Sequence, residues 1–428
     1  MNNNNSNYNA MKGKKILFLG AHKLTIHLIN KAKQMGLYTI VTDYVKDAPA
    51  KKAADEAYDI STLDIDALTA LAREKEVNAV FTGYVDINLA PCRKICDALG
   101  LPFYATLEQL AQTMNKVNFK NNCRKYGIKV VDDVPESLLK NNYEGINYPV
   151  IVKPADSYSS KGISVCHYKE EMPGAIQKAL DVSTCRQIVV EKYLEAEDVY
   201  LYFTIQDGYL SLSAMADRLL NDEQYGCAPQ PVGYFFPSKY IDLYYQKVHA
   251  SLQTMIDKLG IKNGSFFMQG FVVEQDIVFF EMGLRLSGGA GYLQIAKQNG
   301  IDQIEMHIRY ALTGKFDGWD LKTCDNPRFP QPACVLVVLL QNGKIGRIDG
   351  LEAVMAHRNV FDIVQFKEVG DELKEKGTLN QVFARIYMTG ENERDLKDTI
   401  AFVKRHLRIA DTKNQNMILN LFNEDQVY

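Results

Sequence analysis

The sequence predicts a multidomain protein that combines the α/β and α+β classes, with a Rossmann-like N-terminal domain, a mixed central unit and a small mixed C-terminal domain. Its 428 residues, 46% of them hydrophobic, exceed what one compact core usually holds. Strand-like and helix-like stretches alternate from residue 12 to residue 104, which is typical of a parallel sheet with helices on its faces. After residue 148 both kinds of element continue without that regular order.

The ends and the composition of the chain limit the classes of function. The first residues, MNNNNSNYNA, are polar and of low complexity, so residues 1–11 are expected to form a disordered tail rather than a signal peptide. The longest apolar run, ACVLVVLL at 333–340, is much shorter than the roughly 20 residues of a spanning helix. The formal net charge of -3 does not predict a surface for nucleic acid. We therefore expect a soluble, cytoplasmic protein with no membrane or nucleic-acid partner.

The eight cysteines are scattered along the chain, and no CxxC pair occurs among them. Only Cys92 and Cys96 lie close together, four residues apart on an expected helix. A zinc site needs a second pair with ligand spacing, so we expect reduced thiols, some of them buried.

In the N-terminal domain, short apolar runs mark the strands and longer amphipathic stretches mark the helices. The strands are KKILFLG, YTIVTD and NAVFTG, and the helices include LTIHLINKAKQMG and LDIDALTALAREKE. A dinucleotide site is the obvious alternative, because Gly20 follows the first strand and Asp43 ends the second. However, His22 stands where the GxGxxG fingerprint has its second glycine, and without that glycine the backbone cannot easily approach a pyrophosphate.

The rest of the chain divides at a proline-rich stretch. Two helices, TLEQLAQTM and KVNFKNNCRKYG, lie within 105–145. A C-terminal unit begins near PRFPQPAC, where three prolines in six residues mark a boundary. It continues with strand-like runs and a closing helix, namely ACVLVVLL, NVFDIVQF, FARIYMT and ENERDLKDTIAFVKRHL.

The strand in YPVIVKPADSYSSKGISV, residues 148–165, places Lys153 where another apolar residue would pack. A lysine near a strand end can simply guard against edge-to-edge pairing. The loop that follows, from Asp156 to Gly162, is polar and rich in backbone and hydroxyl donors. Such a hairpin can close over phosphate oxygens while a cation neutralises their charge, although no GxxxxGK[ST] loop occurs in the chain. A phosphate ligand and a structural lysine both stay open here.

A second strand, in QIVVEKYLEAEDVYLYF at 187–203, ends its apolar run at Glu191 and leads on to Asp198. Either acid alone is compatible with a solvated side chain. Together with Lys153 they place charge at several strand ends, which indicates a polar ligand lying across the sheet.

The stretch FFMQGFVVEQDIVFFEMGLRLSGGAG, residues 266–291, predicts a hairpin of two apolar strands around a polar turn at 274–276. A three-residue turn sets Gln269 opposite Glu281, and directly opposed residues share a face with Cβ atoms roughly 5 Å apart. Arg285 stays on that face if the strand continues. Magnesium bound to phosphate needs one or two carboxylates plus substrate oxygens, so these residues predict a metal and phosphate site. A plain salt bridge between Glu281 and Arg285 is the alternative.

With these motifs in this order, the chain resembles the ATP-grasp superfamily, in its carboxylate–amine ligase branch. Residues 188–194, IVVEKYL, are similar to the adenine-binding hinge of biotin carboxylase-like enzymes, and FEMGLR stands where the family has a Glu-x-Asn-x-Arg motif. Other relatives are the large chain of carbamoyl-phosphate synthetase and the ATP-grasp ligases of purine synthesis. The resemblance implies a tail at 1–11, a pre-ATP-grasp domain of Rossmann type at 12–106, an ATP-grasp unit at 107–312 with a lid subdomain at about 147–193, and a C-terminal domain at 313–428.

The resemblance also implies a role for each polar residue of these motifs. The residues implied to contact ATP are Lys116, Lys153, Ser159, Ser160 and Gly162, then Glu191, Lys192, Tyr193 and Leu194 of the hinge, with Asp198 on the ribose. Glu281 and Gln269 would hold Mg²⁺, for which Mn²⁺ is an alternative, and Arg285 would bind the γ-phosphate or an acyl phosphate. Lys153, Glu281 and Arg285 would thereby be the catalytic residues.

Departures from the family pattern leave the number of metal ions open. Gln269 replaces an acidic ligand and Gly283 replaces an asparagine, and a neutral amide binds a hard cation more weakly than a carboxylate does. The flap over the triphosphate is rich in serine where relatives are rich in glycine, which predicts a stiffer closure.

The resemblance implies an ATP-dependent ligase, in which a small-molecule carboxylate takes the γ-phosphoryl group and an amine then displaces phosphate to give an amide. Such a transfer depends on positioning and charge stabilisation more than on a protein nucleophile. The sequence does not identify the two substrates, and it leaves a monomer and a homodimer open. LSGGAG at 286–291 is either an anion-binding turn or a plain glycine-rich loop, and Asp217-Arg218 either faces the substrate or forms a surface ion pair.

Two other functions stay open. A binding module that retains nucleotide but has lost catalysis agrees with Gln269 and Gly283, whereas the retained lysines, Glu281 and Arg285 favour an enzyme. A pyridine-nucleotide dehydrogenase is the third hypothesis, and the missing glycines weaken it.

Overall fold

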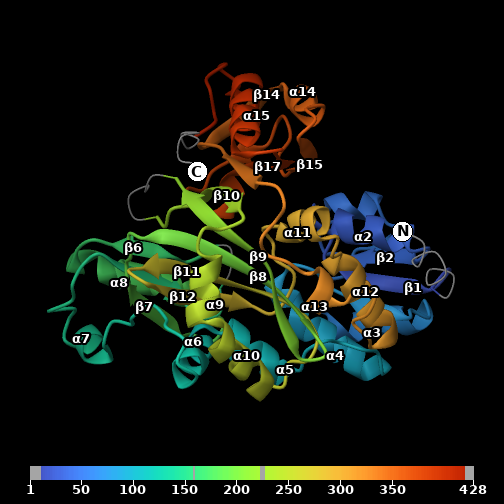
Figure 1. Ribbon diagram of the computed structural model, residues 1–428, viewed down its shortest axis with the longest axis horizontal. Coiled ribbons are helices and arrows are strands. Elements are labelled where there is room, and N and C mark those ends of the chain that lie inside the picture. The colour runs from blue at the N-terminus through green and yellow to red at the C-terminus, as the bar shows by residue number, and fades with distance from the viewer. Residues whose placement is uncertain (1–10, 158–159, 222–226, 420–428) are drawn as a thin grey trace.

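The computed structural model describes residues 11–157, 160–221 and 227–419, and it confirms the multidomain α/β and α+β architecture (Figure 1). A parallel sheet lies at the N-terminal side, a small sheet lies on the opposite side, and a long antiparallel sheet runs between them. A further three-stranded sheet lies near the C-terminus. The expected tail falls outside the described residues except for Met11, which is buried.

The N-terminal sheet has the order β3-β2-β1-β4, with parallel pairing throughout. Its strands are β1 (Lys15–Leu19), β2 (Tyr38–Thr42), β3 (Glu56–Tyr58) and β4 (Ala79–Phe81). The helical segments between and after them are α2 (Thr25–Gln34), η1 (Pro49–Lys52), α3 (Ile65–Glu74), η2 (Asp86–Asn88) and α4 (Leu89–Leu99).

Strand β1 lies between two large cores. Ile16 and Phe18 belong to one apolar cluster, whereas Leu17 and Leu19 belong to the other. This alternation follows from the two-residue period of a strand. The first cluster continues into the C-terminal strands and the second into the central sheet, so the N-terminal sheet shares both of its cores with the rest of the chain.

The small sheet, of order β6-β5-β7, falls within the range expected for the lid. Its elements are β5 (Val150–Pro154), β6 (Ser164–Cys166), η3 (Lys169–Glu171), α8 (Met172–Val182) and β7 (Ile188–Lys192), and α5 (Leu107–Met114), α6 (Lys116–Lys125) and α7 (Glu136–Lys140) precede them. Its apolar side chains form a separate small cluster that includes Val150, Val152 and Met172. A unit with its own core can move as a body relative to its neighbours.

The central sheet has eight strands in the order β12-β11-β8-β9-β10-β13-β17-β15. Their bounds are β8 (Glu197–Gln206), β9 (Tyr209–Leu220), β10 (Pro231–Phe236), β11 (Gly264–Val273), β12 (Asp276–Gly283), β13 (Ala333–Leu339), β15 (Val360–Gln365) and β17 (Val382–Thr389). Because β10 pairs with β13, the sheet continues across the boundary expected at residue 313, and the C-terminal strands extend the central sheet.

The remaining elements cover this sheet or form the C-terminal sheet of order β16-β14-β18. They are α9 (Ile241–Lys247), α10 (His249–Lys258), α11 (Gly291–Asn299), α12 (Gln303–Thr313), α13 (Leu321–Cys324), β14 (Gly343–Asp349), α14 (Leu351–Met355), β16 (Glu372–Leu373), η4 (Leu379–Gln381), α15 (Glu393–His406) and β18 (Arg408–Asp411).

The predicted hairpin consists of β11 and β12, and Gln269 lies opposite Glu281 as expected. The turn is shorter than predicted, because Val273 pairs with Asp276 and leaves two residues between the strands. A bulge between Gln269 and Gly270 places one extra residue in β12 and thereby restores the predicted register.

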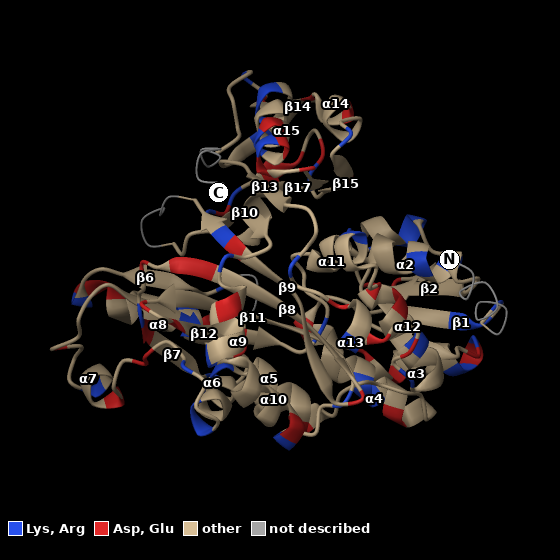
Figure 2. Cartoon of the chain, in the orientation of Figure 1, with Lys and Arg blue, Asp and Glu red and all other residues tan. Residues whose placement is uncertain are grey.

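No helix within the described ranges is long and apolar enough to cross a membrane. Basic and acidic residues are interspersed over the described chain (Figure 2), in agreement with the net charge of -3. All eight cysteines are free thiols, and five of them are buried.

Candidate functional site

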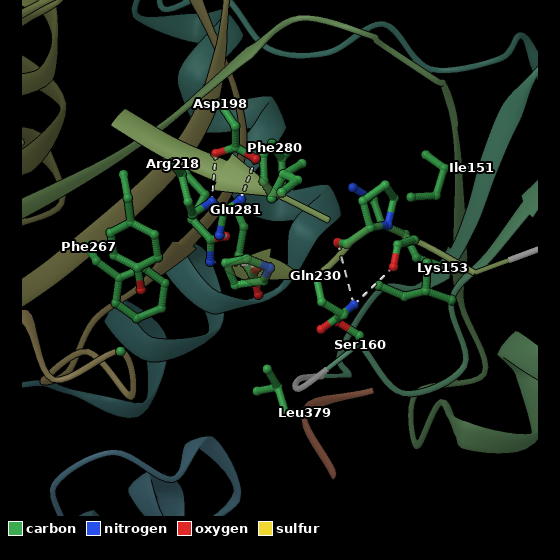
Figure 3. A pocket seen from close by; sticks show the side chains of 18 of the residues that line it. Ile151, Lys153, Ser160, Asp198, Arg218, Gln230, Phe267, Phe280, Glu281 and Leu379 are labelled. Atoms are coloured by element: carbon green, nitrogen blue, oxygen red, sulfur yellow. Dashed lines mark hydrogen bonds and ion pairs between the residues drawn. The ribbon is translucent and has the colours of Figure 1, made fainter. Parts of the chain in front are cut away.

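A cavity of about 410 Å³ lies between the lid and the central sheet and reaches both terminal parts of the chain. It brings together nearly all of the residues that the sequence indicates, and Figure 3 shows Lys153, Ser160, Asp198 and Glu281 among them. Those that line it are Lys116, Lys153, Ser160, Glu191, Lys192, Tyr193, Leu194, Asp198, Gln269, Glu281 and Arg285. Gly162 is not among the lining residues, and Ser159 lies outside the described residues.

At the lid end of the cavity, the carboxylate of Glu191 is buried between two lysines. Its Oε1 accepts from Nζ of Lys120 at 2.7 Å, and its Oε2 pairs with Nζ of Lys153. Glu191 is 1% exposed, and a buried carboxylate is stable only when it is paired in this way. Lys153 is therefore a structural cation that also lines the cavity, and its role as a phosphate ligand stays a prediction.

The hinge after Glu191 uses most of its backbone donors inside the fold. The N–H of Lys192 donates to the Asp132 carbonyl at 3.1 Å, and the N–H of Tyr193 donates to the Pro149 carbonyl at 3.2 Å. Among the described residues, no acceptor engages the N–H of Leu194. Apolar side chains line the cavity beside the hinge, namely Val131, Ile151, Ile163 and Phe280.

The loop between β5 and β6 is held at both of its described ends. Nζ of Lys116 donates to the Ser157 carbonyl at 2.7 Å, and Oγ of Ser157 donates to the Lys161 carbonyl at 2.7 Å. Gly162 has φ of +75°, and a Cβ there would lie 2.8 Å from Cγ of Pro154. Glycine at 162 therefore serves the close approach of the loop to β5.

Gln230 connects this loop to the C-terminal part of the chain. Its Nε2 donates to Oγ of Ser160 at 3.4 Å (Figure 3) and to the Gly377 carbonyl at 3.2 Å. The side chain is 2% exposed and lines the cavity. The flap at Ser160 and the loop at Gly377 are thus both bonded to the amide of Gln230.

Arg218 joins an acid and an amide near the middle of the cavity (Figure 3). Its Nε donates to Oδ1 of Asp198 at 2.8 Å, and its NH1 donates to Oε1 of Gln269 at 2.7 Å. Burial opposes the charge, but the Asp198 carboxylate raises the pKa of Arg218 above its ordinary value. A surface ion pair of Asp217 with Arg218 is wrong, because Arg218 lines the cavity and Asp217 is buried, where it accepts from Ser238.

Glu281 is the carboxylate that faces the expected phosphate region. Nε2 of Gln269 donates to its Oε2 at 3.2 Å, and its Oε1 lies 3.7 Å from Nζ of Lys116. Gln269 thus turns its nitrogen to Glu281 and its oxygen to Arg218. Within the described ranges, no group of three or more His, Cys, Asp and Glu residues could hold a metal ion. The donor set fits a Mg²⁺ ion that takes one carboxylate and completes its shell with phosphate oxygens and water.

Phe267 occupies the space that a side chain at position 283 would need. A Cβ on Gly283 would lie 2.4 Å from two atoms of the Phe267 ring. The ring lines the cavity and stacks on Tyr200, with centroids 5.2 Å apart. The absence of asparagine at 283 therefore has a packing reason, and no side-chain oxygen is available there to ligate a cation.

Arg285 is paired with Asp86 and forms no salt bridge with Glu281. Its Nε donates to Oδ1 of Asp86 at 2.7 Å, its NH2 pairs with Oδ2, and its NH1 donates to the Leu286 carbonyl at 2.9 Å. Although burial opposes the charge, Asp86 raises the pKa of Arg285. Because Asp86 belongs to η2, this ion pair joins the N-terminal domain to the segment after β12.

The glycine-rich segment after β12 lines the inner end of the cavity. The carbonyl of Gly288 accepts from Arg385, and Oγ of Ser287 lies 2.8 Å from the Tyr200 hydroxyl. The positive φ in this segment, +55°, occurs at Ala290 rather than at a glycine. The expectation that glycine's freedom at positive φ shapes the turn is therefore wrong.

The residues of the site that were not predicted from the sequence include Asp86, Lys120, Gln230 and Arg385. Lys120 could have been found, because it lies four positions after Lys116 on α6 and shares its face. Asp86 and Arg385 have no local pattern, since their partners lie 199 and 97 positions away.

The N-terminal sheet does not offer a dinucleotide site. Asp43 accepts from the N–H of Ala21 at 2.8 Å and from the N–H of Val45 at 2.9 Å. Both carboxylate oxygens thus hold the loops beside β1 and β2, which weakens the dehydrogenase hypothesis further.

A lid with its own core, a hinge on its last strand and a cation-lined cavity against an antiparallel sheet define the class. The fold is that of the ATP-grasp ligases, and the chain is similar to their carboxylate–amine branch, as its motifs predict. The family model described as D-ala D-ala ligase C-terminus matches residues 121–225.

Known proteins similar to the chain are ligases and transferases of this kind. Formate-dependent phosphoribosylglycinamide formyltransferases of Synechococcus sp. (strain CC9605) and Francisella tularensis subsp. tularensis (strain SCHU S4 / Schu 4) are 25% and 27% identical to it. These matches cover 69% and 81% of this chain and 75% and 87% of the relatives. The L-amino acid ligase from Bacillus licheniformis superposes with a TM-score of 0.77 at 16% identity, covering 94% of this chain and 99% of that one. The phosphoribosylglycinamide synthetase from Anaerococcus prevotii gives 0.70 at 19% identity, covering 94% and 100%.

Proposed function

We propose that the protein uses ATP and Mg²⁺ to activate a small carboxylate as an acyl phosphate and passes the acyl group to an amine, giving an amide, ADP and phosphate. The observation that carries the proposal is one cavity that runs from the hinge at 191–194, past Lys116, Lys153 and Glu281, to Arg285. The cavity thus offers apolar walls for a purine, then cations for the phosphates, and then space beside Arg285 for the second substrate.

We assign the adenine to the slot beside the hinge, where the N–H of Leu194 is the donor for a ring nitrogen. The apolar faces of Ile151 and Phe280 suit a flat purine. Glu191 accepts from the adenine amino group while it stays paired with Lys120 and Lys153. Asp198, which the resemblance implies on the ribose, serves instead to fix the Arg218 guanidinium.

The phosphate region contains one protein carboxylate and several cations. Glu281 is the ligand for a single Mg²⁺ or Mn²⁺ ion, which neutralises phosphate charge when it is bound. Lys116 and Lys153 bind phosphate oxygens directly. Arg218 donates to the side-chain oxygen of Gln269 at 2.7 Å, so this oxygen is not available as a ligand for a second metal ion. The Arg218 guanidinium supplies positive charge at that position instead.

In the first step, the substrate carboxylate oxygen attacks the γ-phosphorus and ADP leaves with the electron pair of the broken P–O bond. In the second step, the amine nitrogen attacks the acyl carbon, phosphate leaves with the C–O electron pair, and the nitrogen loses a proton. Arg285, oriented by Asp86, stabilises the charge that develops on the transferred group. The flap excludes water, which would otherwise hydrolyse the acyl phosphate.

The first test is thermal stability with ATP, ADP and NAD, each with and without Mg²⁺, because a ligand that binds only the native state raises the melting temperature. We expect a Mg²⁺-dependent increase with ATP and ADP and none with NAD. Phosphate release is then screened over pairs of carboxylates and amines. The absence of any shift with adenine nucleotides would contradict the proposal.

The second candidate is an ATP-binding module with little or no catalysis. The amide at Gln269 and the ring of Phe267 against Gly283 favour it, because both reduce the ligands for divalent cations. A nucleotide-dependent increase in melting temperature without phosphate release from any substrate pair would select this function.

A further inference from the structure

The inner end of the cavity holds a buried cation that pairs with no acidic side chain of the described residues. Arg385, on β17, lines the cavity and is 7% exposed. Its NH1 donates to the Gly288 carbonyl, its Nε has no hydrogen-bond partner, and its guanidinium lies 5.2 Å from the centre of the Phe366 ring. Among the described residues, no carboxylate forms an ion pair with Arg385.

The other buried or half-buried cations of the cavity each have a carboxylate partner. These pairs are Lys116 with Glu281, Lys153 with Glu191, Arg218 with Asp198, and Arg285 with Asp86. An unpaired buried charge costs several kcal/mol. A cation that stays unpaired on the wall of a substrate cavity therefore needs an anion that arrives with the ligand.

Aromatic rings form the walls around this end of the cavity. Tyr84, Tyr200, Tyr234 and Phe267 all line it. The Tyr200 ring stacks on Phe267 at 5.2 Å and meets the edge of Tyr234 at 5.8 Å. Apolar surface placed against such rings contributes about 25 cal/mol for each Å² removed from water. A ligand that fits here has an apolar or aromatic body beside its anionic group.

We propose that the substrate bound at this end is an organic monocarboxylate with an apolar or aromatic body, whose carboxylate pairs with Arg385. This inference rests on the proposed ligase function and names its substrate class. One uncompensated guanidinium matches the single charge of a carboxylate. A phosphate monoester carries about -1.5 to -2 at neutral pH and would leave charge unpaired. The inference thus separates this chain from relatives named for a phosphoribosyl substrate.

The test uses the full chain saturated with ADP and Mg²⁺ and compares four probes by calorimetric titration and thermal stability. Phenylacetate has both features, acetate lacks the ring, phenylacetamide lacks the charge, and phenyl phosphate carries the wrong charge. We expect phenylacetate to bind at least tenfold more tightly than the other three. Phenylacetamide loses the charge-assisted hydrogen bond, which contributes about 1.5–3 kcal/mol, or roughly 10- to 150-fold in Kd. Acetate loses the apolar contact of the ring, and phenyl phosphate leaves one charge unpaired.

Two variants separate ligand binding from a structural role. Arg385→Gln should weaken phenylacetate at least tenfold without lowering the melting temperature of the free protein, because it removes an unpaired buried charge. Arg385→Lys keeps the charge but not the planar fork, and should give intermediate affinity. Arg347→Gln is the matched control, since Arg347 also lies in the C-terminal part but is largely exposed and paired with Asp349.

Each outcome has a defined meaning. Tighter binding of phenyl phosphate than of phenylacetate, or equal binding of phenylacetate by Arg385→Gln, would overturn the inference. A lower melting temperature of Arg385→Gln, with unchanged phenylacetate affinity, would make Arg385 structural. If ADP with Mg²⁺ fails to stabilise the unmodified protein, the ligase proposal itself fails. If it stabilises the protein and no carboxylate binds, only the substrate class is wrong.

A last arm identifies which substrate carries the carboxylate. With ATP and hydroxylamine, formation of a hydroxamate from phenylacetate shows that the bound carboxylate is the one that is phosphorylated. Binding without hydroxamate, together with competition against amines that carry a carboxylate, assigns Arg385 to the amine substrate. Both results support the monocarboxylate site.

Discussion

Replacing Lys153 by methionine should weaken nucleotide binding and also destabilise the free protein. A lysine that only bound phosphate would give the first effect with an almost unchanged melting temperature. In the structure, however, Nζ of Lys153 pairs with Oε2 of Glu191, which is 1% exposed. Removing one partner of a buried ion pair costs about 3–5 kcal/mol. Because Glu191 keeps Lys120 at 2.7 Å, we expect a smaller loss, about 1–3 kcal/mol.

Lys120→Met is the matched control for this experiment. It removes the other cation from Glu191, but Lys120 does not line the cavity. Both variants should therefore melt a few degrees lower than the unmodified protein without ligand. Only Lys153→Met should lose direct phosphate contact, which corresponds to about 1.5–3 kcal/mol or roughly a 10- to 150-fold increase in the Kd for ADP with Mg²⁺.

Two measurements are needed on each variant: the melting temperature without ligand, and a calorimetric titration with ADP and Mg²⁺. An equal loss of affinity for ADP in both variants would refute the reasoning, because Lys153 would then act only by holding Glu191. An unchanged melting temperature of Lys153→Met would refute the structural half, and the buried pair would contribute nothing measurable.

Three further predictions concern the metal region and the core. Gly283→Asn should lower the melting temperature, because its Cβ would lie 2.4 Å from the Phe267 ring. The same change should lower the melting temperature less in a Phe267→Ala background. Additive effects of the two changes would show that the ring is not the obstacle. Gln269→Glu should enlarge the stabilisation by Mg²⁺ in the presence of ADP, because it adds a carboxylate beside Glu281, and identical Mg²⁺ titrations of variant and parent would contradict this. His307 is 1% exposed, neither ring nitrogen has a partner, and burial lowers its pKa to about 3. The unfolded chain takes up the proton below about pH 6.5, so stability is lost as the pH falls from 6.5 toward 3, by about 1.4 kcal/mol at pH 5.5. His307→Phe should therefore lose less stability than the parent between pH 7.5 and 5.5. An equal loss in both proteins would mean that other groups govern this range.

The sequence predicted the parts of the site that depend on local periodicity. The two-residue period of β11 and β12 places Gln269 and Glu281 on one face, and their register holds even though the turn is one residue shorter and a bulge compensates. Lys153 and Glu191 were found because each follows an apolar strand and interrupts its pattern. Charge at a strand end is visible without any knowledge of the partner.

The partners themselves could not be predicted in the same way. Asp86 reaches Arg285 across 199 positions, and Arg385 reaches Gly288 across 97. Such contacts depend on how whole domains pack, and no spacing in the chain encodes them. The glycine at 283 was visible as a departure from a family pattern. Its cause, the close approach of the Phe267 ring, is apparent only in the folded chain.

The pairing of β10 with β13 has a consequence for how the chain can be divided. A version that stops before residue 313 would leave β10 with one unpaired edge in an otherwise apolar sheet. Exposed edges of this kind recruit strands from other molecules, so such a fragment would aggregate instead of persisting as a smaller nucleotide-binding protein. It would also lack Arg385. We therefore expect the C-terminal strands to be exchangeable only together with the rest of the sheet.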